Sequence, residues 1–266
     1  MDITAEFRGI VDVLCFGEVI VDFFPEKLGI PLRRASHFNM KLGGAPANVA
    51  VGIARLGGRV ALHGAVGNDE FGAFLSNQLR SEGVEVSALV SLEECKTAIT
   101  FVSVDPDGER SFHGFREKTA DRGLTPGHLD LAMISQSGCF HFGSNLLTNA
   151  SCREATNCAL DNASSAGSLI SFDPNIRLHL WEQPHEALPA IRDILSRTHL
   201  VKLSEEEHRL LFPAVEIEDC YQSCYQPEGI SAVVITQGAR GATVFTENCH
   251  LNIPARVVNT VDTTGA

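Results

Sequence analysis

Apolar runs typical of buried strands alternate along most of the chain with segments whose apolar residues recur at helical spacing. Residues 11–24 read as one long strand, and Val49, Ile53 and Leu56 of the following APANVAVGIARLGG segment share one face of a predicted helix. Further predicted strands are residues 60–66 and 84–90 and the segments GCFHFGS, SLISFD, HLVKLS and AVVITQG. The helices predicted between them cover residues 70–82, 151–166, 186–198 and 205–212.

This alternation of strands and helices predicts an α/β fold with a mainly parallel central sheet. Residues 232–236 are apolar at every position but the last, which is typical of a parallel strand covered by helices on both faces. No internal repeat, low-complexity tract or linker rich in proline and serine interrupts the pattern. We therefore expect a single domain over residues 1–266.

One stretch departs from the alternation. AITFVSV and ERSFHGF flank Pro106-Asp107-Gly108, so residues 98–115 predict a β-hairpin that projects from the sheet as a flap. We expect the strands of this lid at about residues 20–40 and 96–117. We expect one apolar face of the flap, formed by Ile99, Phe101, Phe112 and in part Val104, to have no helix that covers it. Exposed strand edges tend to pair, so we expect a homodimer in which two flaps pair. A second hairpin is predicted over residues 242–256, with its turn near 247–248.

Composition and charge exclude several classes of protein. With 44% hydrophobic and 20% charged residues the chain is globular, and a net charge of -12 without any run of lysine or arginine argues against a nucleic-acid partner. The first residues lack the pattern of a signal peptide, and no stretch of about 20 apolar residues could span a membrane. The eight cysteines and ten histidines show no metal-binding spacing. We expect a cytoplasmic protein with reduced thiols.

Candidate chemistry begins in the segment LGGAPANVA. Gly43 and Gly44 permit close approach of the backbone, and the side chain of Asn48 can both donate and accept hydrogen bonds, which suits a polyhydroxy ligand. The alternative is a tight turn in which Asn48 only caps the helix. Asp22 favours the interpretation that a ligand binds here, because a carboxylate inside the apolar run VIVDFF needs a hydrogen-bond partner or water.

Two glycine-containing segments are candidates for binding an anion. TQGARG follows a predicted buried strand, at the edge of the sheet where open α/β folds bind ligands, although a plain hairpin turn explains it equally well. The terminal DTTGA would expose backbone N–H groups at a helix start, where they can stabilise a phosphoryl charge.

These segments, taken in order, resemble the pfkB (ribokinase-like) family of sugar kinases, and within it the fructokinases. The similarity includes FGEVIVDF, GGAPANVAVGIARLGG, VGNDEFG, SFDPNIR, VKLSEEE, TQGARG and VDTTGA, which together span almost the whole chain. The resemblance implies a three-layer α/β/α sandwich with a β-flap lid. It also implies transfer of the γ-phosphoryl group of ATP, with Mg²⁺ and a K⁺ site, to the 6-hydroxyl of D-fructose.

The family pattern implies roles residue by residue. Sugar binding falls to Asp22, Gly43, Gly44, Asn48 and Arg116, and Arg116 would also reach the transferring phosphate. The nucleotide side would comprise Asp173, Asn175, Lys202, Thr236, Gly238 and Gly241. Metal ions would be held by Glu207, Asp262 and Thr264, and the catalytic anion hole would include Gly265 and Ala266. Ser204 departs from the family's NxxE pattern, as it does in fructokinase-like members.

The same resemblance places the catalytic base, an aspartate, two residues beyond Ala266 in a DTTGAGD motif. A chain without that aspartate is expected to bind sugar but to be close to inactive. One alternative substrate is 2-keto-3-deoxygluconate or a related keto sugar, because its kinases share the Gly-Gly-Ala-x-x-Asn and Asp-Pro-Asn patterns. An alternative of another class is a regulatory or interaction protein that resembles a kinase and does not catalyse.

Overall fold

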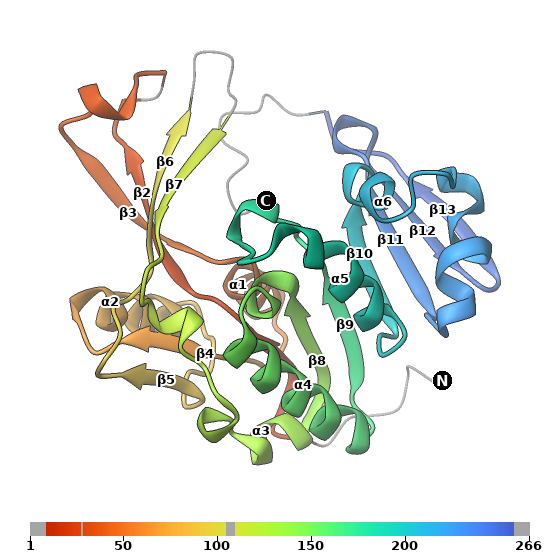
Figure 1. The fold of residues 1–266 in the computed structure, drawn as a ribbon, viewed down its shortest axis with the longest axis horizontal. Helices are drawn as coiled ribbons and strands as arrows, with labels where there is room; N and C mark the ends of the chain where they lie inside the picture. Colours follow the sequence, from red (N-terminus) through yellow and green to blue (C-terminus); the bar gives the residue numbers. More distant parts are fainter. Residues whose placement is uncertain (1–8, 28, 105–109, 258–266) are drawn as a thin grey trace.

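The computed structural model describes residues 9–27, 29–104 and 110–257, and within them the chain forms two β-sheets (Figure 1). The main sheet has the strand order β13-β12-β11-β10-β9-β8-β1-β4-β5, and all neighbours are parallel except the antiparallel pairs β11·β12 and β12·β13. Its strands are β1 Val11–Phe16, β4 Val60–Gly67, β5 Leu89–Leu92, β8 Ser137–Gly143, β9 Leu169–Asp173, β10 Leu200–Ser204, β11 Ala232–Thr236, β12 Ala242–Thr246 and β13 Cys249–Ile253.

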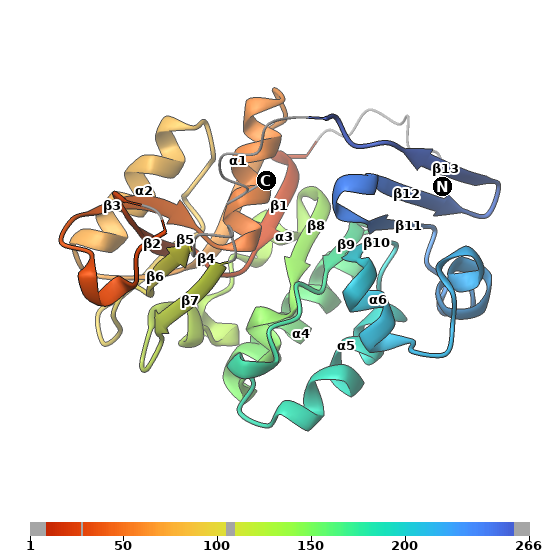
Figure 2. The same cartoon turned by 90° about the horizontal axis from the view of Figure 1, so that it is seen from above.

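Six α-helices of the described residues flank the main sheet. They are α1 Ala45–Arg55, α2 Glu70–Ser81, α3 Leu131–Ser135, α4 Ala150–Ser165, α5 Ala187–Leu195 and α6 Glu205–Leu211. Figure 2 shows α4, α5 and α6 on one side of the sheet and α1 on the other, and α3 packs against α4. The fold is therefore the predicted α/β fold with a mainly parallel sheet, although α1 and α2 cover their face only near β1, β4 and β8.

The face beneath α3 to α6 holds the larger hydrophobic core. Phe16, Phe140, Phe142 and Phe172 alternate inward from three adjacent strands, and the successive ring centroids lie 5.4, 5.7 and 4.8 Å apart. Aromatic pairs at this spacing add to the free energy gained from burial alone. On the opposite face, residues such as Val234 on β11 are only partly buried, since no helix of the described residues packs over β11 to β13 there.

A second, four-stranded sheet rises above the carboxyl ends of the main strands, and we call it the lid sheet (Figure 1). Its strand order is β3-β2-β6-β7, with β2 parallel to β6 and antiparallel to β3. The strands are β2 Ile20–Pro25, β3 Phe38–Gly43, β6 Ile99–Val104 and β7 Arg110–Phe115. The expected flap hairpin is thus present, and the second hairpin turns between β12 and β13 as predicted.

The single strand predicted over residues 11–24 is wrong. β1 ends at Phe16 in the main sheet, and β2 starts at Ile20 in the lid sheet. The break falls at Gly17, where a Cβ atom would lie 2.5 Å from Cγ of Pro46, so only glycine lets the chain pass helix α1. A smaller error concerns residues 84–90, because the strand β5 forms only from Leu89 onward.

The apolar residues of the lid do not share one face, as the sequence analysis assumed. Phe101 pairs with His113, whereas Phe112 pairs with Val102 and points to the opposite side, because side chains alternate along a strand. The Phe101 face is also partly covered: Phe101 stacks on Phe23 with 5.0 Å between ring centroids, and Phe23 meets Phe71 of α2 at 5.8 Å.

Among the described residues, no helix combines the length and the apolar character needed to cross a bilayer.

Candidate active site

A cavity of about 660 Å³ lies between the lid sheet and the carboxyl ends of the main strands. Polar and charged side chains from distant parts of the sequence meet in it, namely Glu18, Asp22, Asn48, Arg116, Asn145 and Arg177. In open α/β folds this edge of the sheet is where ligands bind. The cavity therefore has the position and the polar lining expected of an active site.

Asp22 is the most unusual of these groups. It lies in the middle of β2, opposite Lys41 on β3 and Thr100 on β6, and its side chain is buried. Burial raises the pKa of Asp22 to about 6, against the opposing charge of Arg116. Its Oδ1 accepts no hydrogen bond from the described residues. A buried carboxylate oxygen without a donor is costly, so the geometry suits a ligand that brings hydroxyl donors.

The glycine-rich segment shapes the wall next to Asp22. Gly44 is the N-cap of α1 with a left-handed φ of 105°, and a Cβ atom there would lie 2.4 Å from the backbone oxygen of Glu18. Asn48 sits one turn into α1 and lines the cavity, so the capping role considered as an alternative is filled by Gly44 instead. The segment thus brings a helix start and an amide side chain against the cavity.

Glu18 was not identified from the sequence. It is buried in the connection between β1 and β2, and its Oε1 accepts a hydrogen bond from the N–H of Ala45 at 3.1 Å. Burial raises the pKa of Glu18, while the charge of Arg116 lowers it. The signal in the sequence was a carboxylate directly after Gly17 within an apolar run, which is the same signal that identified Asp22.

Arg116 follows β7 and brings a largely buried cation to the cavity. Its Nη2 forms an ion pair with Asp121, and its Nη1 donates to Oδ1 of Asn145 at 3.4 Å. Burial disfavours the charged guanidinium, but the ion pair with Asp121 and the charge of Glu18 outweigh this and raise the pKa of Arg116. Asp121 and Asn145 were also missed by the sequence analysis, although Asn145 lies just past the carboxyl end of β8, where ligands are expected.

The residues assigned to the nucleotide lie at or just past the carboxyl ends of β9 and β11, apart from Lys202 in the middle of β10. Nζ of Lys202 is 3.0 Å from Oδ2 of Asp173, and Asn175 adopts a left-handed φ of 41° two residues further on. Thr236 ends β11 opposite Ser204. Gly238 and Gly241 follow in a turn with φ values of 57° and 100°, conformations that favour glycine. The structure thus brings these residues to one edge of the sheet.

Glu207 holds this edge together. Its Oε1 accepts from the N–H of Ile176 at 2.7 Å, and its Oε2 accepts from the N–H of Ser204 at 2.8 Å, which completes a capping box at the start of α6. Glu205, in the same turn, forms an ion pair with Arg240 of the TQGARG loop. The first turn of α6 therefore anchors both loops that flank the proposed phosphate site.

A metal site is not assembled among the described residues, since no three His, Cys, Asp or Glu side chains cluster there. Glu207 uses both oxygens to accept backbone amides, so its predicted role toward a metal stays a prediction. The remaining predicted residues Asp262, Thr264, Gly265 and Ala266 lie outside the described residues.

The chain belongs to the pfkB family of carbohydrate kinases, whose pattern matches residues 11–266. It is therefore a phosphotransferase of the sugar-kinase class. It is 38% identical over 255 residues to fructokinase-2 of Solanum habrochaites, a match that covers 96% of this chain and 77% of the relative.

Solved structures of related proteins agree with this assignment. A fructokinase of Vibrio cholerae O395 with bound fructose, ADP and calcium is 34% identical with a TM-score of 0.84, covering 95% of this chain and 79% of that one. An E. coli protein assigned as a ribokinase II, in complex with ATP and Mg²⁺, is 28% identical with a TM-score of 0.87, covering 95% of this chain and 81% of that one. The ribokinase-like fold expected from the sequence is thereby confirmed.

Proposed function

We propose that the protein is a fructokinase that transfers the γ-phosphoryl group of ATP to the 6-hydroxyl of D-fructose. The observation that carries the proposal is the cavity beneath the lid sheet, where a buried carboxylate, Asp22, faces a fixed guanidinium, Arg116. A neutral polyol supplies the hydroxyl donors that Asp22 lacks among the described residues. The relatives that are fructokinases support fructose as the sugar.

Sugar recognition is assigned to the groups on the lid side of the cavity. Asp22 accepts two sugar hydroxyls, Asn48 both donates and accepts, and Gly43 and Gly44 keep the backbone close enough for these contacts. The lid sheet excludes water from the reacting hydroxyl, which strengthens every electrostatic interaction in the cavity. Arg116 lines the same cavity, and we assign to its cation the stabilisation of the transferring phosphoryl group.

The nucleotide is assigned to the edge formed by Asp173, Asn175, Lys202, Thr236, Gly238 and Gly241. Mg²⁺ would enter as the Mg²⁺ complex of ATP, held mainly by phosphate oxygens. Glu207 would act on that complex through the loops it anchors. A K⁺ site at Asp262 and Thr264, an anion hole at Gly265 and Ala266 and a following catalytic aspartate are proposed from the family resemblance.

A coupled assay tests the proposal with D-fructose and 2-keto-3-deoxygluconate as competing substrates. The second sugar is included because Arg177 on the cavity could pair with its carboxylate. We expect a kcat/KM for fructose at least tenfold higher, and we expect Asp22→Asn to reduce sugar binding measured by calorimetry. A higher kcat/KM for 2-keto-3-deoxygluconate would identify that sugar acid, and not fructose, as the substrate. Sugar binding without ATP turnover would instead favour the regulatory or interaction protein that resembles a kinase and does not catalyse.

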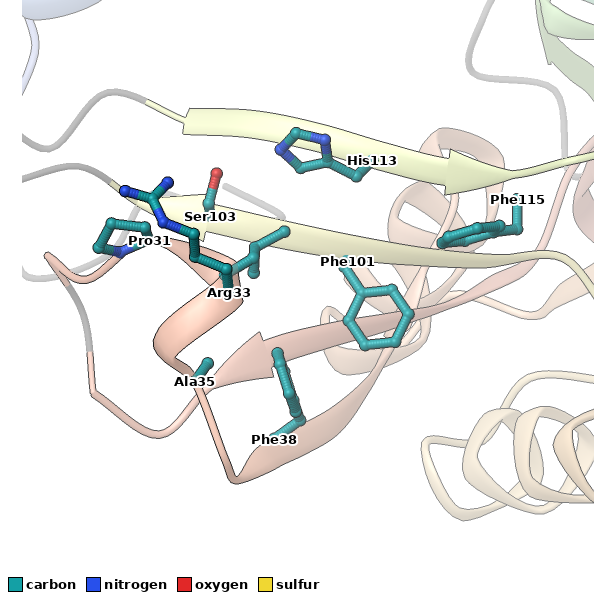
Figure 3. A pocket seen from close by; sticks show the side chains of 9 residues that line it. Pro31, Arg33, Ala35, Phe38, Phe101, Ser103, His113 and Phe115 are labelled. Carbon is teal, nitrogen blue, oxygen red and sulfur yellow. The ribbon is translucent and has the colours of Figure 1, made fainter.

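We further propose a homodimer that pairs two lid sheets. The outer face of the lid holds an open apolar pocket of about 600 Å³, in which Phe101 and Phe115 lie toward one end and Pro31, Arg33 and Ser103 toward the other (Figure 3). Phe115 at the edge strand β7 is 66% exposed, and exposed edges of this kind pair readily with another chain. Sedimentation should give a dimer at micromolar concentration, and Phe115→Ser should shift it to monomer. A wild-type monomer under these conditions would reject the proposal.

A cytoplasmic location is proposed from the thiols. All eight cysteines lie within the described residues and all are free, which is typical of proteins kept in a reducing compartment. Fractionation of cells that express the protein would test this.

A further inference from the structure

Two of the four chain connections between the main sheet and the lid sheet meet in one cluster of charges. Glu18 lies in the connection from β1 to β2, and Arg116 and Asp121 lie in the connection that leaves β7. The side chain of Arg116 is 13% exposed and that of Asp121 is 1% exposed. Buried charges are retained only where they are paired, so the Arg116–Asp121 contact sets the arrangement of the cluster.

Asp121 is held rigidly by its own backbone. It lies in a short 3-10 turn, Ala120–Arg122, whose first N–H, from Ala120, donates to the backbone oxygen of Lys96 at 2.8 Å. The hydroxyl of Thr119 donates to the backbone oxygen of Arg116 at 3.2 Å, and Sγ of Cys152 at the start of α4 lies 3.6 Å from the backbone oxygen of Asp121. The backbone that carries the carboxylate is therefore anchored to α4 and to the segment that precedes β6.

Arg116 has other carboxylates within electrostatic reach. Its charge acts on both Glu18 and Asp22, and its buried Nε has no partner among the described residues. If Asp121 did not hold one end of the guanidinium, the side chain could turn toward Glu18 or Asp22 and pair there. Pairing with Asp22 would occupy the carboxylate that the proposed function assigns to sugar hydroxyls.

We propose that Asp121 is a positioning residue, which holds the guanidinium of Arg116 at the cavity wall and so keeps Asp22 free for a sugar. The inference rests on the proposed function for the identity of the ligand. It assigns Asp121 no contact with the substrate. Its effect on sugar binding must therefore pass through Arg116.

A double-mutant cycle separates this role from a general structural one. The cycle compares wild type, Asp121→Asn, Arg116→Met and the double variant, by kinetics for both substrates and by the pH dependence of sugar binding. Other charged or titratable groups that face Asp22 or line its cavity are Glu18, Lys41, His113, Arg177 and His179, and all stay unchanged. Glu182→Gln is the matched control, because it removes the neighbouring Arg122–Glu182 pair, 3.4 Å long, outside the cavity.

We expect Asp121→Asn to lower kcat/KM for the sugar on the order of tenfold to a hundredfold, with KM for ATP nearly unchanged. The midpoint of the pH dependence of sugar binding should move to lower pH, since a closer guanidinium favours the ionised form of Asp22. In the Arg116→Met background, Asp121→Asn should have no further effect on either quantity. Glu182→Gln should behave as wild type.

Two results would overturn the inference. The first is an Asp121→Asn variant whose pH midpoint of sugar binding and whose KM for the sugar equal those of wild type. The second is an Asp121→Asn substitution that changes these quantities as much in the Arg116→Met background as it does in wild type. If Asp121→Asn does not fold, Asp121→Glu keeps the charge, displaces it, and should give a smaller change of the same sign. If the wild-type protein binds no fructose, the proposed function is wrong, but the positioning role of Asp121 can still be tested. The NMR shift of the Asp22 carboxyl carbon, followed against pH, shows whether Asp121 keeps Arg116 away from Asp22.

Discussion

A Cβ atom on Gly43 would lie 2.2 Å from Oδ2 of Asp22. The two residues sit on adjacent antiparallel strands of the lid sheet, with Gly43 opposite Ile20. No pair of atoms tolerates such a separation, so any side chain at position 43 forces the carboxylate to move. Glycine is needed here for space alone, because it leaves the Asp22 carboxylate room to face the cavity.

Gly43→Ala should therefore abolish most sugar binding while the protein stays folded. We expect a loss of affinity on the order of tenfold or more, since a displacement of about 1 Å in a binding group has effects of this size. Calorimetric titration with fructose measures it. The matched control is Gly52→Ala on α1, where a Cβ atom meets nothing within 4 Å and should add about 0.5–1 kcal/mol of stability. Equal sugar affinity in both variants would exclude the role assigned to Gly43.

Asp22→Asn should stabilise the folded protein at neutral pH. The folded-state pKa of Asp22, about 6, exceeds its ordinary value of 3.8, so the folded state binds the proton more tightly than the unfolded chain. Ionisation thus costs folding stability as pH rises from about 4 to 6, and the full cost, about 1–3 kcal/mol, is present above pH 6. The variant should melt higher than wild type at pH 7 and equally at pH 4. A variant that melts lower at pH 7 would show that Asp22 is satisfied within the protein.

The order of strands and helices could be predicted because it depends on local patterns. Apolar runs, glycine stops and the turn near 247–248 are properties of short segments, and the structure follows them. The break at Gly17 could not be predicted from the run itself. It depends on the ring of Pro46, which lies almost thirty positions away in the sequence and is brought close only by the folded sheet.

The residues of the candidate site likewise fall into those that could be recognised from the sequence and those that could not. Asp22 and the GGAPAN segment are recognisable because a buried acid and paired glycines are unusual wherever they occur. Asp121 lies in an unremarkable TADRG stretch, and its role arises only when the turn is pinned under Arg116 by α4 and the Lys96 backbone. Residues whose function is to hold another side chain give little signal in a single sequence.

Glu207→Gln should destabilise the protein more than Glu206→Gln. Both changes remove one negative charge from the first turn of α6 and so affect the helix dipole equally. Only Glu207 accepts the N–H groups of Ile176 and Ser204, and a neutral amide has one oxygen to offer them. Leaving one amide without a partner costs about 1–3 kcal/mol. Thermal melting gives the difference, and indistinguishable melting temperatures would mean that Glu207 does not anchor the DPN loop.

The pH dependence of stability should contain a second, opposite contribution from buried histidines. His63 is fully buried, and its Nε2 accepts a hydrogen bond from the N–H of Asp130 at 3.0 Å, which only the neutral ring can do. Burial is the main reason that the pKa of His63 falls from 6.5 to about 4, and burial likewise lowers the pKa of His141 to about 4. The unfolded chain therefore binds these protons first, and stability is lost as pH falls from about 6.5 to 4.

His63→Gln isolates this contribution, because the Gln oxygen can still accept from Asp130 but does not titrate. We expect the variant to be less stable than wild type at pH 7 through imperfect packing, and to lose less stability on acidification, by up to about 3 kcal/mol between pH 6.5 and 4. Since Asp22 acts with the opposite sign over an overlapping range, the measurement is made in the Asp22→Asn background, where its contribution is absent. Urea unfolding at several pH values gives the slopes. If stability depends on pH in the same way in the two proteins, protonation of His63 costs no folding stability. That result would contradict the neutral ring that the hydrogen bond from Asp130 requires.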